Sequence, residues 1–263
     1  MTARQPSFFI PHGGGPCFFM PDPARHWAGM GAFLRSLPEQ LAEPPAAILV
    51  ISAHWETDGF RVTRSSGLPL IYDYFGFPAQ TYTLRYDAPG SAEIADEVVR
   101  LLRQKDISVE PDVERGFDHG VFIPMKVAFA QATIPIVAMS VDKLLDPAQH
   151  IAAGRALASL REQGVLIIGS GMSFHNLRAF GDKRFTSLSV EFDQWLTSTL
   201  MQPGDTRSAK LAQWAEAPGA QLAHPTAEHL IPLMVAAGAS EAPGQKIYGE
   251  LVLEAAVSGF RFD

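Results

Sequence analysis

The sequence has one cysteine, a deficit of basic residues and no long apolar run. Cys17 cannot form a disulfide within the chain, so a packed core must hold the fold together. The 21 lysines and arginines are outnumbered by 28 aspartates and glutamates, and the formal net charge is -7. Nucleic acid is therefore not an expected partner, because its phosphates call for basic stripes that this sequence lacks. No run approaches the length that crosses a bilayer, so no membrane partner is expected either.

The N-terminal segment "MTARQPSFFI" lacks the long apolar stretch of a signal peptide. Together with the lone cysteine, this predicts a cytoplasmic protein. A chain of 263 residues can bury a sizeable core without disulfides or a structural metal. No low-complexity linker or internal repeat divides it, so we expect one domain over residues 1–263.

Short apolar runs alternate with longer segments of helical period. Four runs rich in β-branched residues are typical of strands buried on both faces, at 7–11, 46–52, 133–141 and 164–170. Segments 91–105 and 147–164 predict helices, the first with Ser91 as N-cap and the second ended by Gly164. Residues 185–237 are mostly helical in pattern. The alternation favours an α/β fold with a mainly parallel central sheet and helices on its faces.

Histidines stand where the predicted strands end. His12 directly follows the first run, His54 comes two residues after the second, and His175 comes a few residues after a third. Ligands of open α/β sheets lie in the crevice outside the carboxyl ends of the strands. Because residues 13–15 are glycines, His12 has the only side chain in this turn that could bind a metal. They indicate either an ordinary tight turn or a backbone that makes room for a site.

Further candidates lie in two other segments. His119 stands in a glycine-flanked loop before a helix, and "HPTAEHLIPL" brings His224, Glu228 and His229 to a helix start. Taken alone, Glu228 is explained as an anion that stabilises a helix N-terminus.

Two histidines are not assigned to a site. His26 lies among helix-like surface residues, and we expect His150 on a solvent-facing helix position.

Motifs of other chemistries are missing or incomplete. Neither HExxH nor the GxSxG elbow is present, and the serines of "GSGMS" are out of register for that elbow. "HGGGP" lacks the Lys and Ser/Thr of a Walker A motif. Several imidazoles converging from separate elements suit a borderline metal, so the residues favour non-haem Fe(II) or catalytic Zn(II) with open positions.

Six motifs occur along the chain in a fixed order. They are "PHGGGP", "SAHW", "YDYFGFP" (72–78), "DHGVFIPM" (118–125), "GSGMSFHNLR" (169–178) and "HPTAEHLIPL" (224–233). In this order the chain resembles class III, LigB-type extradiol ring-cleaving dioxygenases, with the closest likeness to the DOPA 4,5-dioxygenase branch. The resemblance runs over nearly the whole chain. It implies one α/β domain with a mixed central sheet and a mononuclear non-haem iron site.

The resemblance also implies which residues hold the metal. His12, His54 and His229 match the ligands, with Fe(II) as the cofactor and Zn(II) able to occupy the site in purified protein. Many relatives outside the DOPA branch use a carboxylate as the third ligand, so Glu228 is the second choice after His229. Neighbours on a helix point about 100° apart, so only one of the two is expected to face the metal.

The same resemblance assigns two histidines to catalysis. His175 matches the acid/base beside the metal, although in zinc-bound relatives it can approach the ion, and His119 matches a histidine of the substrate pocket. The implied reaction inserts both atoms of O2 into a small catecholic substrate, DOPA-like or related, beside rather than between the two hydroxyls. Tyr72, Tyr74 and Phe75 are candidates to line the pocket and equally candidates for the core.

Two alternatives stay open at this point. A Memo-type interaction protein uses the same fold without catalysis, although the full set of histidines favours an enzyme. A zinc-dependent hydrolase is the other, since zinc has no redox chemistry. The sequence names neither the catechol nor the cleaved bond, and an assembly of several copies is left open.

Overall fold

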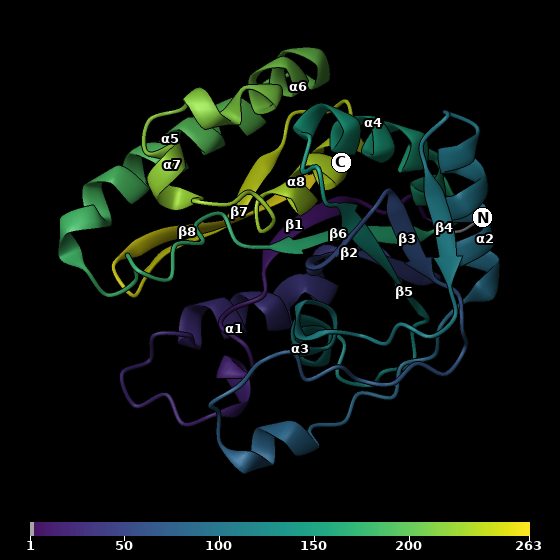
Figure 1. Cartoon of the computed structure of the whole chain (residues 1–263), viewed down its shortest axis with the longest axis horizontal. Helices are drawn as coiled ribbons and strands as arrows, with labels where there is room; N and C mark the ends of the chain where they lie inside the picture. Colours follow the sequence, from purple (N-terminus) through teal and green to yellow (C-terminus); the bar gives the residue numbers. More distant parts are fainter. Residues whose placement is uncertain (1–2) are drawn as a thin grey trace.

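A mixed sheet runs through the middle of the molecule (Figure 1). The computed structural model describes residues 3–263. The strands are β1 (Ser7–Pro11), β2 (Ala47–Thr57), β3 (Phe60–Thr63), β4 (Val109–Asp112), β5 (Ile136–Asp142), β6 (Val165–Gly171), β7 (Gln245–Val252) and β8 (Ala255–Phe262). Their order across the sheet is β4-β3-β5-β2-β6-β1-β8-β7.

The centre of the sheet is parallel and its margins are partly antiparallel. Strands β5, β2, β6 and β1 are parallel neighbours, as are β3 and β4. Strand β8 pairs antiparallel with both β1 and β7, and β3 meets β5 in the same sense. The predicted α/β fold with a mixed, mostly parallel sheet is confirmed.

Eight α-helices surround the sheet among the described residues. They are α1 (Ala28–Ser36), α2 (Ala92–Arg103), α3 (His119–Ala128), α4 (Pro147–Leu157), α5 (Thr186–Leu200), α6 (Gly204–Ala212), α7 (Ala220–Ala223) and α8 (Ile231–Gly238). Short 3-10 helices lie at Cys17–Phe19, Leu37–Gln40, Ala79–Thr83, Ala158–Gln163, Lys183–Phe185 and Trp214–Glu216. In Figure 1, α1 and α3 lie below the sheet, whereas α4, α8 and the green α5–α7 lie above it.

Local signals set the helix ends as predicted. The Ser91 hydroxyl accepts a hydrogen bond from the backbone N–H of Ile94, which caps α2. The predicted helix 147–164 is α4 followed by a 3-10 segment, and Gly164 ends it in the left-handed conformation at φ 80°.

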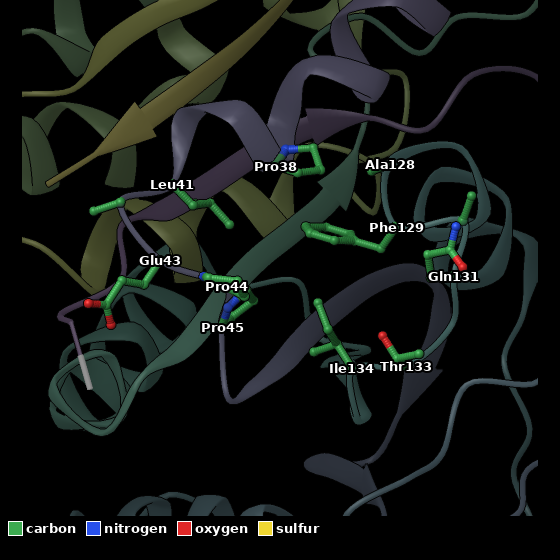
Figure 2. Close-up of a pocket in the computed structure, with 12 residues that line it drawn as sticks. Pro38, Leu41, Glu43, Pro44, Pro45, Ala128, Phe129, Gln131, Thr133 and Ile134 are labelled. Carbon is green, nitrogen blue, oxygen red and sulfur yellow. The ribbon is translucent and has the colours of Figure 1, made fainter. Parts of the chain in front are cut away.

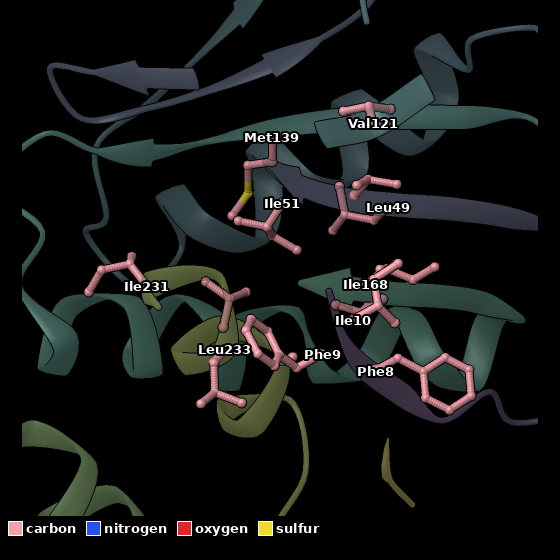
Figure 3. Packing of buried hydrophobic residues seen from close by; sticks show 14 of the residues in the cluster. Phe8, Phe9, Ile10, Leu49, Ile51, Val121, Met139, Ile168, Ile231 and Leu233 are labelled. Carbon is pink, nitrogen blue, oxygen red and sulfur yellow. The ribbon is translucent and has the colours of Figure 1, made fainter. Parts of the chain in front are cut away.

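The core lies on both faces of the central strands (Figure 3). Phe9, Ile51 and Ile168 on the strands are completely buried, and so are Ile231 and Leu233 on α8. Helix α8 is apolar on every side and buried along its whole length, which explains why it shows no amphipathic stripe. Its tight packing on β1 and β6 fixes where the chain before it enters the site.

Among residues 3–263, none of the helices has the length and apolar character that a membrane span requires.

Candidate active site

Three histidines from three separate elements meet at the carboxyl edge of the sheet. His12 directly follows β1, and its backbone N–H donates to Gly171 O at 3.1 Å. His54 lies inside β2 rather than after it, because that strand runs on to Thr57; the predicted strand end at 52 was wrong. His229 lies just before α8.

Their Nε2 atoms face one another. His54 Nε2 is 3.1 Å from His12 Nε2 and 3.2 Å from His229 Nε2. Bonds of about 2.0–2.1 Å from imidazole to a metal place neighbouring ligand nitrogens roughly 3 Å apart. The three rings could therefore hold one metal ion.

The Nδ1 atoms of His12 and His229, which are the ring nitrogens opposite Nε2, show why a cation fits. The Ser170 hydroxyl donates to Gly120 O, so it accepts the proton of His12 Nδ1 at 3.2 Å. The carboxylate of Glu228 accepts from His229 Nδ1 at 2.9 Å. With these protons on Nδ1, the Nε2 atoms of both rings turn lone pairs inward, and converging lone pairs suit a metal ion.

Burial keeps these imidazoles neutral, which is the form that binds metal. His12 is 1% exposed and His229 is 4% exposed. Burial and the nearby His54 and His229 hold the pKa of His12 well below its usual value. Burial likewise lowers the pKa of His229 to about 4, against the opposing hydrogen bond to Glu228.

Glu228 lies behind the ring of His229 rather than among the Nε2 atoms. Its Oε1 accepts from His229 Nδ1 and is also 3.4 Å from His175 Nδ1. Burial by itself raises the pKa of this carboxyl, but the hydrogen bonds from His175 and His229 outweigh it and hold the pKa well below its usual range. An ionised carboxylate in this place orients both rings.

His175 lies beside the three Nε2 atoms but on its own loop after β6. Its ring stacks on that of His229, with centroids 3.3 Å apart and an interplanar angle of 14°. Its backbone N–H donates to Ala223 O at 2.8 Å, which ties the loop to α7. The ring is only partly buried, so it is open to a bound molecule.

His119 is the first residue of α3, so its prediction as a loop residue was wrong. Asp118 caps the helix by accepting from the backbone N–H of Val121 at 3.2 Å. The cap leaves the His119 ring tilted over His54, with centroids 3.9 Å apart. His119 is thus part of the same histidine cluster.

Asp73 was missed by the sequence analysis, although it lies in the quoted motif "YDYFGFP". Its Oδ1 accepts from both the backbone N–H and Nδ1 of His119, each at 2.9 Å. Burial by itself raises the pKa of Asp73, but the hydrogen bonds from His119 outweigh it and leave the pKa below its ordinary value. Its place in that motif was the only signal in the sequence that could have singled out Asp73.

The other histidines lie away from this cluster. His26 is exposed, as expected. His150 is fully buried, contrary to the predicted solvent-facing position, because it packs on Phe60 and accepts from the backbone N–H of Asp142 at 3.1 Å. His224 is also buried, and its Nε2 donates to Ser173 O at 3.0 Å. These contacts are structural.

The glycines after His12 serve the turn and its packing. Gly13 and Gly15 have φ angles of 82° and 54°, which favour glycine. A Cβ on Gly13 would lie 2.6 Å from Cys17 Sγ, and one on Gly15 would lie 3.0 Å from the Phe77 ring. Both glycines are therefore required by the conformation of the turn and by its packing against Cys17 and Phe77.

Two hollows adjoin the cluster and share Thr226 and Glu228. One of about 470 Å³ lies against Ala53, His54, Glu56, Leu145, Thr226, Glu228 and His229. The other, of about 720 Å³, reaches from His175 and Pro225 to Asn176, Leu177, Arg178, Ala179, Asp182, Arg184 and Phe185. Both sizes suit a small molecule.

The predicted aromatic lining is not found in either hollow. Tyr74 is buried and donates to Thr81 O at 2.7 Å, and Tyr72 donates to Leu84 O at 2.6 Å. Phe75 is 91% exposed. The tyrosines therefore belong to the packing of their loop.

A third hollow, of about 450 Å³, holds none of the site histidines (Figure 2). It lies between the segments that precede β2 and β5, and Leu41, Pro44, Phe129 and Ile134 line it. Those segments enter the sheet at the amino ends of the strands, whereas the histidines lie at the carboxyl ends.

Comparison with known proteins places this site in a family. Residues 7–259 match the family of the catalytic LigB subunit of aromatic ring-opening dioxygenase. The chain belongs to the LigB family of class III extradiol dioxygenases. As a LigB-type extradiol ring-opening dioxygenase it is an oxidoreductase, and its family uses a non-haem metal.

Individual proteins resemble the chain over most of their own length. A 4,5-DOPA dioxygenase extradiol of Beta vulgaris is 39% identical, over 94% of this chain and 90% of that protein. The dioxygenase tasH of Hapsidospora irregularis is 38% identical, over 89% of this chain and 78% of its own. The crystal structure of an uncharacterized protein from Escherichia coli K12 superposes with a TM-score of 0.75 at 28% identity, covering 99% of this chain and all of the other.

Proposed function

We propose that this LigB-type enzyme uses Fe(II), held by His12, His54 and His229, to open the ring of a small catechol with O2. The observation that carries the proposal is the convergence of Nε2 atoms at 3.1 and 3.2 Å, with acceptors behind His12 and His229. Iron held by these three residues would supply the redox chemistry that couples a catechol to O2.

His175 is proposed as the acid/base of the reaction. It is partly open to solvent, stacks on His229 and has Glu228 at 3.4 Å from its Nδ1. In this place it can take the proton of the second catechol hydroxyl and return a proton later. His119, tilted over His54, is proposed to contact the substrate.

A DOPA-like catechol is the proposed substrate class. Relatives in Beta vulgaris and Escherichia coli bear the name 4,5-DOPA dioxygenase extradiol, at 39% and 34% identity. The two hollows that share Thr226 and Glu228 offer room for a ring beside His54 and for a substituent beyond His175. A substrate of this size is consistent with their volumes.

The test is reconstitution of the metal-free protein with Fe(II) under anaerobic conditions, followed by a panel of catechols that includes DOPA. On admission of O2 we expect a yellow ring-opened product with iron, and none with zinc or with His229→Ala. Turnover of an ester or amide with zinc and not with iron would instead support the hydrolase. Metal binding without turnover of any compound would support the Memo-type alternative.

A further inference from the structure

Asp73 joins two histidines of the cluster through one carboxylate. Its Oδ1 accepts two hydrogen bonds from His119, one from the backbone N–H and one from Nδ1. Its Oδ2 faces His54 Nδ1 at 3.6 Å, which is too long for a hydrogen bond but within reach of an electrostatic attraction. The side chain is 23% exposed, so solvent only partly screens it.

Glu228 makes the same kind of arrangement with two other histidines of the cluster. Its Oε1 accepts from Nδ1 of His229 and faces Nδ1 of His175. Each carboxylate thus lies behind one proposed metal ligand and one further histidine. The two carboxylates come from segments far apart in the sequence, so the repetition does not arise from one local turn.

An ionised carboxylate beside Nδ1 favours the tautomer with the proton on that nitrogen, because it can only accept hydrogen bonds and its negative charge attracts the N–H. A proton held on Nδ1 leaves a lone pair on Nε2. For His54 that lone pair points at His12 and His229, as the Nε2 distances show. For His119, the hydrogen bond from Nδ1 to Asp73 leaves Nε2 as the nitrogen that is free to accept a proton.

We propose that Asp73 is a positioning residue that holds His54 in its metal-binding tautomer and His119 with Nε2 free. The first part rests on the proposed metal site, and the second on the proposed reaction. Asp73 itself touches neither metal nor substrate in this account.

The decisive variant is Asp73→Asn, because the backbone N–H of His119 settles how the new amide lies. That N–H can only donate, so the amide oxygen must take the place of Oδ1. The amide NH2 then faces His54 Nδ1 and favours the His54 tautomer whose proton lies on Nε2. A protonated Nε2 has no lone pair to offer a metal. We expect a loss of metal affinity of roughly 10- to 100-fold, as for other groups that orient ligands.

The measurement is a titration of metal-free protein with Co(II), followed by the visible absorption of the bound ion. Asp96→Asn is the matched control, since Asp96 pairs with Arg64 on the surface and the same chemical change there should leave the titration unaltered. Asp73→Glu should restore part of the affinity. Wild-type affinity and spectrum in a folded Asp73→Asn protein would overturn the proposal.

Stoichiometry separates this role from a second metal site. His54, Asp73 and His119 are themselves close enough to hold an ion. We expect one Co(II) per chain. Two ions per chain, with the second lost in Asp73→Asn, would overturn the positioning role.

The effect on His119 is tested by turnover at saturating Fe(II). Asp73→Ala should lower kcat in the wild-type background. In a His119→Phe background it should lower kcat little further, because both changes remove the same function. Fully additive losses would overturn this part. If the wild-type protein opens no catechol at all, the proposed function fails, while the Co(II) titration still decides the role of Asp73.

Discussion

Single side chains decide whether a group of histidines can receive a metal. A ring offers one nitrogen to a cation only when the proton lies on the other, so each ligand needs an acceptor behind it. Ser170 lies behind His12, and Glu228 lies behind His229. The site is therefore defined as much by these acceptors as by the imidazoles.

Replacing His229 or Glu228 separates a ligand from the group that orients it. We predict that His229→Ala abolishes retention of the metal, because one of three converging nitrogens is lost. Glu228→Gln should keep most of the metal, with at most a loss of roughly 10- to 100-fold in affinity, since the amide oxygen can still accept from His229 Nδ1. Metal analysis of both purified variants checks this. Loss of metal in the Glu228 variant alone would make the carboxylate the ligand.

Replacing His175 tests proton transfer apart from metal binding. His175→Phe keeps an aromatic ring to stack on His229, and we expect it to retain iron and affinity for catechol. Turnover should fall by about 10²- to 10⁴-fold, the usual contribution of a positioned acid/base. Single-turnover kinetics with measured iron content checks the prediction. A metal-free variant would show that His175 is a ligand, and wild-type turnover would remove it from the reaction.

The sequence brought the histidines and Glu228 into view, but not the other partners of the histidines. Strand ends and the ordered motifs singled out each of the five rings that the structure gathers. Ser170 and Asp73 lie in two of the ordered motifs, but nothing local marks them as partners, because the histidines they contact are 158 and 46 residues away. His150 was misplaced for a related reason: the helix period gives a face, but only the packing of Phe60 on that face buries it.

Strands and helices bring the histidines together through close backbone contacts. Gly171 ends β6, and a Cβ there would overlap the carbonyl oxygen of His229. Met172 N–H donates to that same carbonyl at 3.0 Å. The segment before α8 can therefore approach the sheet only because β6 ends in glycine.

Gly171→Ala tests this contact, with Gly67→Ala as its control. We predict that Gly171→Ala costs about 1–3 kcal/mol of unfolding free energy, as overpacking commonly does, and weakens metal binding by displacing His229. A Cβ on Gly67 would meet nothing within 4 Å, so that variant should keep both properties. Thermal unfolding and metal content of the two proteins check this. Normal metal content in Gly171→Ala would show that the contact does not place His229.

The central elements were predictable and the marginal ones were not. The four apolar runs became the parallel strands β1, β2, β5 and β6, because strands buried on both faces leave an unbroken apolar signal. Strands β3 and β4 have four residues each, too few for a pattern. Strand β7 is largely exposed, and β8 depends on pairing with β1, which no local signal reveals.

At the scale of the whole molecule, the histidines and the apolar hollow lie at opposite ends of the parallel strands. Helices cover both faces of the sheet (Figure 1), and the histidines lie where the parallel strands end. The apolar hollow of Figure 2 lies at the opposite ends of those strands. This division is common in α/β enzymes, in which the carboxyl ends of strands carry the ligand site.

Oxygen uptake by the Fe(II)-loaded protein, recorded together with the product formed from a catechol such as DOPA, is the most direct test of the proposed reaction. We predict that one O2 is consumed for each catechol, that no hydrogen peroxide appears, and that the yellow product gains the mass of a whole O2 molecule. Hydrogen peroxide accompanied by an unopened, oxidised ring would contradict the account, because the protein would then oxidise catechols without inserting oxygen into them.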